Sequence, residues 1–200
     1  MRALPYGDEA VLVEVEDPLG VLPLAAALRT EPGVVEVVPA ARTLLVRAGP
    51  ATLSRLADRL PELAERSAAG SDGPAAEVVL DVRYDGADLS ASAAELGIGT
   101  DELVRRHVGG RYLVAFCGFT PGFAYLRGLD ETLHISRLAE PRTRVPAGSV
   151  GIADEFTGVY PRASPGGWRL LGRTDAPLWD LDRSPPALLV PGTAVRFRAT

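Results

Sequence analysis

The sequence predicts an α+β protein: a small ferredoxin-like α/β domain, then a larger domain of short β-strands arranged as a closed barrel or a sandwich. Strand and helix patterns alternate over residues 1–66, whereas short β-type runs separated by Gly/Pro turns fill most of residues 77–200. Residues 67–76, SAAGSDGPAA, are small and polar and have the composition of a flexible linker. We therefore expect two domains joined by this linker.

The first domain reads β-α-β-β-α. A strand pattern over residues 10–15 is followed by a helix pattern over residues 17–29, whose initial Asp-Pro supplies an N-cap and a first-turn proline. Residues 34–46 predict a hairpin, and residues 51–64 predict a helix with one apolar face. This order is that of a ferredoxin-like sandwich. No pattern within it points to chemistry, so we expect a scaffold or a surface that contacts a partner.

The second domain begins with a strand of β-branched residues at 77–84. Two short helices are expected at 88–96 and 100–107, the second with Thr100 as its N-cap. From Arg111 onward the pattern is β. The expected strands are RYLVAFC, SVGIA, FTGVY, WRLLGR, ALLV and TAVRF. Many short strands with regular breaks predict a barrel or sandwich of about 120 residues.

The residue types that the chain lacks exclude several functions. The sequence contains no lysine, asparagine or glutamine, and all 21 of its basic residues are arginine. A Walker-type phosphate loop, a Schiff-base or biotinyl lysine and a Ser-Ser-Lys amidase set are therefore excluded. One cysteine and two histidines far apart in the sequence supply few metal ligands, so we expect no metal site.

Charge and hydropathy limit the classes of partner that the chain can bind and the compartment in which it is expected. A net charge of −5 offers nucleic acid no general attraction. The sequence has no run of about 18 apolar residues, as a membrane span needs. Acidic residues in MRALPYGDEAVLVEV stand where a secretory signal needs its apolar core. The single cysteine, Cys117, allows no internal disulfide. We expect a cytoplasmic protein that binds neither nucleic acid nor a membrane.

Three Gly/Pro-rich segments of the second domain carry the candidate site residues: GFTPGFAYLRGL (118–129), PRTRVPAGSVGIA (141–153) and TGVYPRASPGGWRLLGRT (157–174). Rigid loops of this kind often form pocket walls, because they lose little entropy on binding. The candidate substrate-binding residues are Phe119, Thr120, Phe123, Tyr125, Arg142, Arg144, Ser149, Tyr160, Arg162, Ser164, Gly166, Gly167, Arg169 and Arg173. The alternative interpretation is that the segments are plain barrel turns and that the aromatic residues pack inside the barrel.

The arginines and glycines of these segments suggest the class of ligand. Guanidinium groups bind carboxylates and phosphates in bidentate fashion, and backbone amides exposed by glycines bind anions. Strand alternation places Arg169 and Arg173 on one face of their strand and Trp168 on the other. We therefore expect the arginines to converge on a common hollow that binds a small acidic substrate.

His107 is the candidate catalytic residue, and two interpretations are open for it. As the last residue of a helix before Gly109-Gly110, it is a cation stabilised by the helix dipole. At the mouth of a pocket, it is a titratable group available as general acid or base. His134 is predicted at the surface, and Cys117 as a buried apolar residue.

The three segments, together with YDGADL (84–89) and PPALLVPGTAVRF (185–197), resemble the B-subunit family of 5-oxoprolinase. GDEAVLVE (7–14) resembles the opening of that family, so the resemblance covers about the whole chain. The family is also described as allophanate hydrolase subunit 1, and it includes a Kip-type inhibitor of a sporulation histidine kinase. Family members often have a histidine at the place of His107.

The resemblance implies a cyclophilin-like β-barrel after Ala76 and a partner, the C subunit, with a related barrel. Together with a third, lactam-handling A subunit, this hetero-oligomer cleaves 5-oxoproline to glutamate using ATP. Similar paired barrels form the carboxyltransferase part of urea carboxylase. On this basis we expect an enzyme subunit that is inactive alone, with ATP used by the complex and no cofactor assigned to this chain.

Two other functions are compatible with the same fold. A regulatory module that inhibits a sensor histidine kinase is the main alternative, since the Kip-type relatives share the fold. Peptidyl-prolyl isomerase activity rests on the barrel alone, and the motifs of this chain are not those of true cyclophilins.

Overall fold

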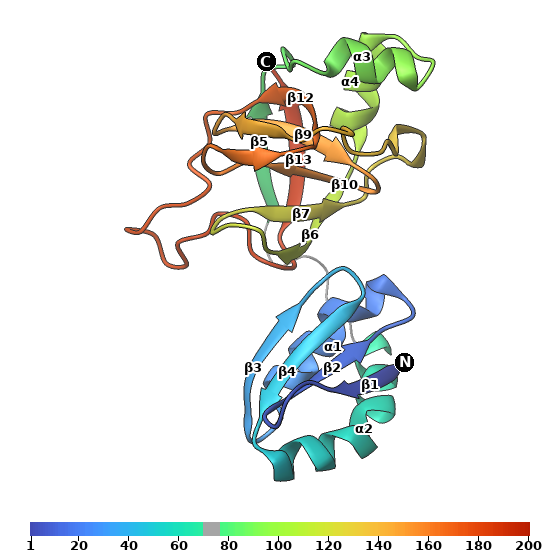
Figure 1. Ribbon diagram of the computed structural model, residues 1–200, viewed down its shortest axis with the longest axis vertical. Helices are drawn as coiled ribbons and strands as arrows, with labels where there is room; N and C mark the ends of the chain where they lie inside the picture. The colour runs from blue at the N-terminus through green and yellow to red at the C-terminus, as the bar shows by residue number, and fades with distance from the viewer. Residues whose placement is uncertain (70–76) are drawn as a thin grey trace. The chain divides into compact units, whose positions relative to one another are not determined.

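A computed structural model describes residues 1–69 and 77–200 of the chain (Figure 1). The chain divides into two compact units, residues 1–73 and 74–200. Of the linker predicted at 67–76, residues 67–69 belong to the last helix of the first unit, and residues 70–76 lie outside the described residues. Among the described residues, no helix is long and apolar enough to cross a membrane.

The first unit contains four strands and two α-helices. In chain order these are β1 (Arg2–Pro5), β2 (Ala10–Glu14), the 3-10 turn η1 (Pro18–Gly20), α1 (Val21–Arg29), β3 (Val34–Pro39), β4 (Thr43–Ala48) and α2 (Pro50–Ala69). The sheet order is β1-β2-β4-β3, and all neighbouring strands are antiparallel. This is the predicted ferredoxin-like arrangement with one addition, the edge strand β1. Its residues are mostly exposed and show no apolar alternation, so the sequence analysis missed it.

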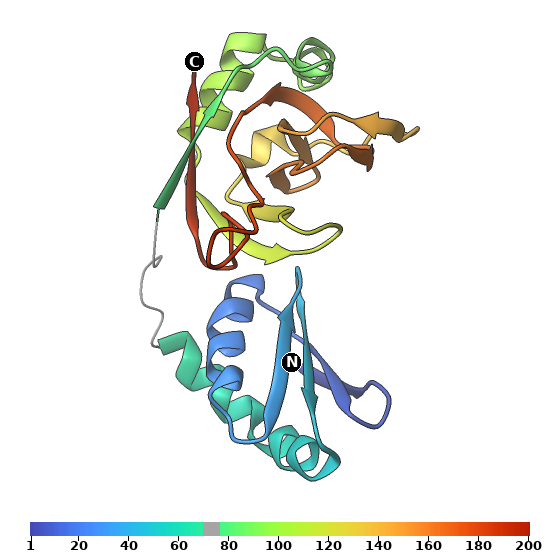
Figure 2. The same cartoon turned by 90° about the vertical axis from the view of Figure 1, so that its left-hand side faces the viewer.

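Both helices of the first unit cover the same face of the sheet (Figure 2). Leu24 and Leu28 of α1 and Leu56 and Leu60 of α2 are buried in one core with the apolar side chains of the strands. Asp17 is a cap, as predicted, but it caps the 3-10 turn: its carboxylate accepts a hydrogen bond of 2.9 Å from Leu19 N–H. The α-helix itself therefore begins only at Val21.

The second unit is rich in short strands. In chain order its elements are β5 (Glu77–Val82), α3 (Leu89–Glu95), α4 (Thr100–Gly109), β6 (Tyr112–Cys117), β7 (Ala124–Arg127), η2 (Glu131–Leu133), β8 (Arg142–Val145), β9 (Ser149–Ala153), β10 (Phe156–Val159), β11 (Ser164–Gly166), β12 (Arg169–Arg173) and β13 (Ala194–Ala199). The predicted ALLV strand is not formed. Its leucines pack into the core instead, and only Ala187 makes a bridge, to Trp179.

The seven main strands form an almost closed barrel in the order β12-β9-β10-β7-β6-β13-β5. The last gap, between β5 and β12, is bridged just beyond β5. There the backbones of Arg83 and Arg173 exchange two hydrogen bonds of 2.9 Å. Gly86 and Asp88 continue this seam by donating to the carbonyls of Leu171 and Leu170, each at 3.0 Å. The segment YDGADL thus closes the barrel.

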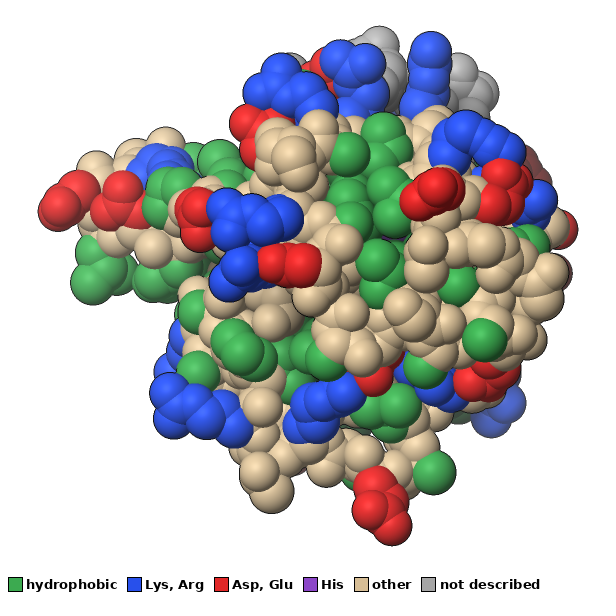
Figure 3. Space-filling view, turned by 90° about the horizontal axis from the view of Figure 1, so that it is seen from above, with side chains coloured by type: hydrophobic (Ala, Val, Ile, Leu, Met, Phe, Trp, Pro, Cys, Tyr) green, Lys and Arg blue, Asp and Glu red, His purple; other side chains and the backbone are tan. Residues whose placement is uncertain are grey.

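A two-stranded ribbon, β8 with β11, is separate from the main sheet and gives the unit a second core. All five residues of β9 are buried, which requires cover on both faces of the strand. Val150 and Ile152 face the barrel core, whereas Ala153 packs with Val145 of the ribbon. Beyond β12, residues 177–187 extend away from the barrel wall (Figures 1 and 3).

Candidate functional site

Three loops meet at one end of the barrel, around Gly122. The backbone of Gly122 has φ +83°, and a Cβ placed on it would lie 3.1 Å from Trp179 Cβ and 3.2 Å from Pro161 Cβ. The loop of residues 118–122 therefore touches both the segment after β10 and the segment after β12. We call this place the rim: it consists of residues 118–122, Pro161 with the adjoining Arg162, and Trp179. Two of the three predicted segments contribute to it.

Phe119 is the most exposed of the predicted site residues that are aromatic. Its side chain is 61% exposed, and its φ of +67° lies in the left-handed region that a bulky residue avoids. The next residue, Thr120, is buried, and its Oγ1 has no hydrogen-bond partner among the described residues. Backbone strain and an unpaired buried hydroxyl in adjacent residues are typical of sites that bind a ligand or a partner.

The other predicted aromatic residues lie below this loop and pack against one another. Phe123 and Tyr160 are each 1% exposed, with ring centroids 5.3 Å apart, and Phe123 is also 5.3 Å from the ring of Trp168. Tyr125 is half-buried and stacks on Phe116 at 4.2 Å. Burial raises the pKa of Tyr160, although a hydrogen bond from the backbone of Trp168 partly offsets this. These rings form the second core, as the packing alternative predicted.

The predicted arginines do not converge on a common hollow. Three of them pair with carboxylates of residues 85–95, which comprise most of the barrel-closing segment and the helix α3 that follows it. Arg142 lies 2.6 Å from Asp88, Arg169 lies 2.9 Å from Glu95, and Arg173 lies 2.8 Å from Asp85. The expectation of a shared anion-binding hollow formed by these three side chains is therefore wrong. Their guanidinium groups attach the segment to the barrel.

A bulge in β12 explains why Arg169 and Arg173 separate. Arg169 pairs with Ile152 and Arg173 with Ser149, with an irregularity between Leu170 and Gly172. One extra residue in a strand reverses the alternation of faces beyond it. The two arginines therefore lie on opposite faces, and the prediction that they share one is wrong. Leu170 and Leu171 are consequently both buried, one in each core.

Arg144 and Arg162 differ from the other three arginines. Both are exposed, and within the described part of the chain neither has an ion-pair or hydrogen-bond partner for its guanidinium. Arg144 lies in the ribbon strand β8, and Arg162 follows Pro161 at the rim. These two side chains remain available to bind an anion.

The remaining predicted residues belong to the ribbon and to the turns around it. Ser149 is buried at the start of β9, and Ser164 is half-buried and pairs with Val145 in the ribbon. Gly166 lies against the ring of Tyr160, and the carbonyl of Gly167 accepts from Leu138 N–H at 2.7 Å. Gly166 permits this close packing, whereas a Cβ at Gly167 would make only ordinary contacts.

His107 is a core residue. Its side chain is fully buried, with Tyr84 Oη 2.7 Å from Nδ1 and Thr157 Oγ1 2.9 Å from Nε2. Thr157 donates its only hydroxyl proton to the carbonyl of Gly151 at 2.9 Å, so it accepts from Nε2–H, and Nδ1 accepts from Tyr84. Burial lowers the pKa of His107 to about 3, so the ring is neutral.

Both expectations for the position of His107 are therefore wrong: it is neither a helix-end cation nor a group at a pocket mouth. The cause is that the C-terminal turn of α4 packs against β13, where Phe197 lies 4.5 Å from the imidazole ring. Its role as general acid or base stays a prediction, and its environment is that of a neutral structural residue.

Sequence reasoning missed three residues that organise this region: Tyr84, Asp88 and Thr157. Asp88 is 6% exposed, and its second carboxylate oxygen accepts from Leu170 N–H at 2.8 Å. The available signal was an acidic residue that follows Gly-Ala within YDGADL. Tyr84 and Thr157 gave no signal, because their partner His107 is remote in the sequence.

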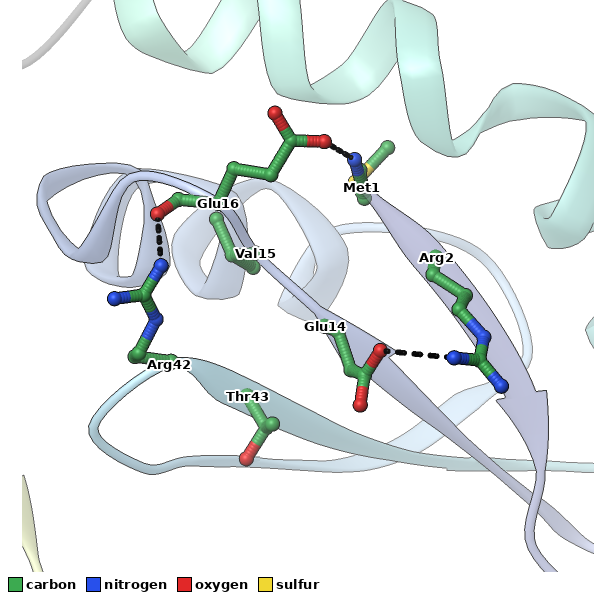
Figure 4. Close-up of a pocket in the computed structure, with 7 residues that line it drawn as sticks. All are labelled: Met1, Arg2, Glu14, Val15, Glu16, Arg42 and Thr43. Carbon is green, nitrogen blue, oxygen red and sulfur yellow. Dashed lines mark hydrogen bonds and ion pairs between the residues drawn. The ribbon is translucent and has the colours of Figure 1, made fainter.

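Two hollows stand out on the described part of the chain, and neither includes a residue of the rim. One of about 430 Å³ is on the first unit, where Glu16 binds the terminal amine and accepts from Arg42 through its carbonyl at 2.7 Å (Figure 4). The other, of about 320 Å³, lies at the barrel seam and includes Arg83, Arg173 and Thr174. Arg173 is the one predicted site residue that lines either of them. Within the described residues, no cluster of three or more His, Cys, Asp or Glu could hold a metal.

Comparison with known proteins places this architecture in a family. The family model "Carboxyltransferase domain, subdomain C and D" matches residues 1–189. The B subunit of 5-oxoprolinase from Escherichia coli O157:H7 is 42% identical over 98% of this chain and 94% of its own length. The chain belongs to the 5-oxoprolinase B-subunit family. A second member, from Haemophilus influenzae, is 36% identical over 98% of this chain and 97% of its own length.

Solved structures support the fold of this member of the 5-oxoprolinase B-subunit family. The crystal structure of TTHA0988 has a TM-score of 0.80 and 36% identity over 96% of this chain. This chain spans only 40% of TTHA0988, so the solved protein is much longer. The Kluyveromyces lactis urea carboxylase, at 18% identity and a TM-score of 0.72, shares the fold over 99% of this chain and 21% of its own. The curated relatives named here carry the enzyme-subunit description, which gives the kinase-regulator alternative no support.

Proposed function

We propose that this chain is the B subunit of an ATP-dependent 5-oxoprolinase and acts in a complex with a C subunit and a lactam-handling A subunit. The observation that carries the proposal is the 42% identity to the corresponding 5-oxoprolinase chain of Escherichia coli over almost the full length of both chains. The reaction is hydrolysis of the lactam C–N bond of 5-oxoproline, which adds water and yields glutamate, coupled to the hydrolysis of ATP.

The structure supports an incomplete site on the chain alone. Neither of the two hollows described above is lined by a rim residue, whereas a small substrate needs a concave site that excludes water. The rim offers an exposed aromatic ring at Phe119, an unpaired hydroxyl at Thr120 and the free guanidinium of Arg162. In the proposed complex, a related barrel of the C subunit covers these groups and completes the cleft. The chain alone is then inactive.

The arginines allow a test of whether the nucleotide fits this chain. Three of the predicted arginines are already neutralised by Asp85, Asp88 and Glu95, which leaves Arg144 and Arg162 as free cations among the predicted residues. Two arginines without a lysine are a weak phosphate site compared with a phosphate loop. We therefore place ATP on another subunit or across the interface.

Reconstitution tests this function. The chain is purified with its cognate A and C subunits, and glutamate release from 5-oxoproline is measured with and without ATP and with each subunit omitted. We expect glutamate only from the complete mixture with ATP. The variants Arg162→Ala and Thr120→Val should lower turnover, whereas Arg2→Ala, a surface change on the first unit, should not. An intact three-subunit complex that leaves 5-oxoproline untouched contradicts the proposal.

A further inference from the structure

The segment of residues 177–187, which we call the finger, presents an unusual apolar side chain to solvent. Leu181 lies near its tip and is 79% exposed, and Trp179, at its base, is 42% exposed. Trp179 also lies against Gly122, so the base of the finger adjoins the rim. Figures 1 and 3 show the finger extending from the barrel. A projecting leucine on a segment whose base carries an exposed tryptophan is typical of an interaction surface.

The finger is held in one conformation by its own hydrogen bonds. Leu188 N–H donates to Leu178 O at 2.9 Å and Asp180 N–H to Pro186 O at 3.0 Å, which joins its two sides. At the tip, Asp182 N–H donates to the carboxylate of Asp180 at 3.0 Å. A segment that is already ordered loses little entropy on binding. These hydrogen bonds order the segment that presents Leu181 to solvent.

Charge at the tip defines the partner further. Leu181 stands between two carboxylates, and Arg183 approaches only one of them, Asp180, at 3.8 Å. The guanidinium of Arg183 also turns back to donate to Pro177 O at 3.0 Å. Asp182 has no ion-pair partner among the described residues. A surface that fits this tip combines an apolar socket for Leu181 with a basic side chain for Asp182.

Neither of the two hollows described above offers an uncharged socket to the finger of a second copy of the chain. Four of the seven residues that line the hollow on the first unit are charged (Arg2, Glu14, Glu16 and Arg42), and so are four of the eight at the seam (Asp81, Arg83, Arg173 and Asp175). Burying a leucine among charged side chains requires their desolvation without compensation. The matching surface is therefore expected on a different protein.

We propose that the finger is an anchor for the C subunit, with Leu181 inserted into an apolar socket and Asp182 paired with a basic residue at its edge. This inference rests on the proposed function for the existence of that partner. The family description, subdomains C and D of a carboxyltransferase domain, and the greater length of TTHA0988 indicate what the finger would contact: the remainder of that domain. Because the finger adjoins the rim, docking there would also cover Phe119 and Thr120.

The test measures the affinity of the full chain for the purified cognate C subunit. Leu181→Asp should weaken binding about tenfold or more, as expected for loss of a buried anchor. Asp182→Arg should slow association and reverse its dependence on salt. Val35→Asp is the matched control, because Val35 is 72% exposed but lies in β3 of the first unit, and it should bind like the wild type. Thermal unfolding of each variant alone should be unchanged.

The outcomes separate this inference from the proposed function. Wild-type affinity for Leu181→Asp overturns the anchor, even if the reconstituted complex releases glutamate. If the anchor variants lose binding but the wild-type complex produces no glutamate, the docking surface stands and the 5-oxoprolinase assignment fails. Self-association of the chain that Leu181→Asp abolishes would assign the finger to a second copy, and it would overturn the choice of partner.

Discussion

Tyr84 Oη lies 2.7 Å from Nδ1 of His107, inside a hydrogen-bond chain that continues through Thr157 to the carbonyl of Gly151. Burial raises the pKa of Tyr84 far above its usual range, so this hydroxyl remains a proton donor. The chain is complete only when His107 is neutral, since protonated Nδ1 would face a donor. The imidazole thus joins α4 to β10 and to the residues after β5 as an uncharged polar link.

The burial of His107 predicts loss of stability in mild acid. Its folded pKa of about 3 lies below the ordinary value near 6.5, so the unfolded chain binds the proton more tightly. The stabilisation is fully present above pH 6.5 and is lost as the pH falls toward 3. Between pH 6.5 and pH 5 the free energy of unfolding should fall by about 2 kcal/mol.

Urea unfolding at several pH values between 5 and 7 measures how steeply the free energy of unfolding changes with pH, which we call the pH slope. His107→Gln should be less stable at pH 7 but should show a much smaller slope. His134→Gln is the control, because His134 is exposed, and it should retain the wild-type slope. An unchanged slope in His107→Gln would show that other groups cause the pH dependence.

Removing a paired arginine should lower the free energy of unfolding more than removing an unpaired one. Arg142→Ala should lower the free energy of unfolding by about 2 kcal/mol, because it leaves the buried carboxylate of Asp88 without its charged partner. Arg144→Ala should change stability by less than about 0.5 kcal/mol, because Arg144 is exposed and unpaired within the described residues. Chemical denaturation of both variants provides the comparison. Equal losses would contradict the roles assigned here.

Closure of the barrel depends on Gly86. An added Cβ at this position would collide with the backbone of Leu170 and Leu171, which cannot move without opening the seam. Gly86→Ala should therefore destabilise the chain by about 3 kcal/mol or prevent its folding. Gly99→Ala is the control, since nothing lies within 4 Å of its added Cβ. Thermal melting of the two variants distinguishes them, and a normal melting temperature for Gly86→Ala would refute the tight seam.

At Phe119 we expect the ring to serve activity while the left-handed backbone conformation lowers stability. Phe119→Gly and Phe119→Ala both remove the ring, but only glycine adopts φ +67° without cost. The glycine variant should therefore be about 1 kcal/mol more stable than the alanine variant. Both should lower glutamate release by the reconstituted complex to a similar extent. Equal stability of the two variants would show that the loop relaxes when the ring is absent.

The α+β fold class, most of the secondary-structure elements and the family were accessible from the sequence. These follow from local periodicity and turn chemistry, such as the apolar face of α2 and the Gly/Pro breaks between the strands of the barrel. The candidate rim was also predicted in part, because the segment 118–129 places a threonine and aromatic residues beside glycines. ALLV shows the limit of such patterns, because an apolar run packs equally well without forming a strand.

What the sequence by itself determined is the set of chemical groups: arginine as the only basic residue type besides two histidines, no phosphate-loop lysine, and glycine-rich loops around aromatic residues. Only the tertiary structure decided how those groups are used. The pair of Arg142 with Asp88, 54 positions apart, and the separation of Arg169 from Arg173 depend on barrel closure and on one bulge. Burial, likewise, decided that His107 is neutral. Partners and desolvation are set by contacts remote in sequence, and no local pattern encodes them.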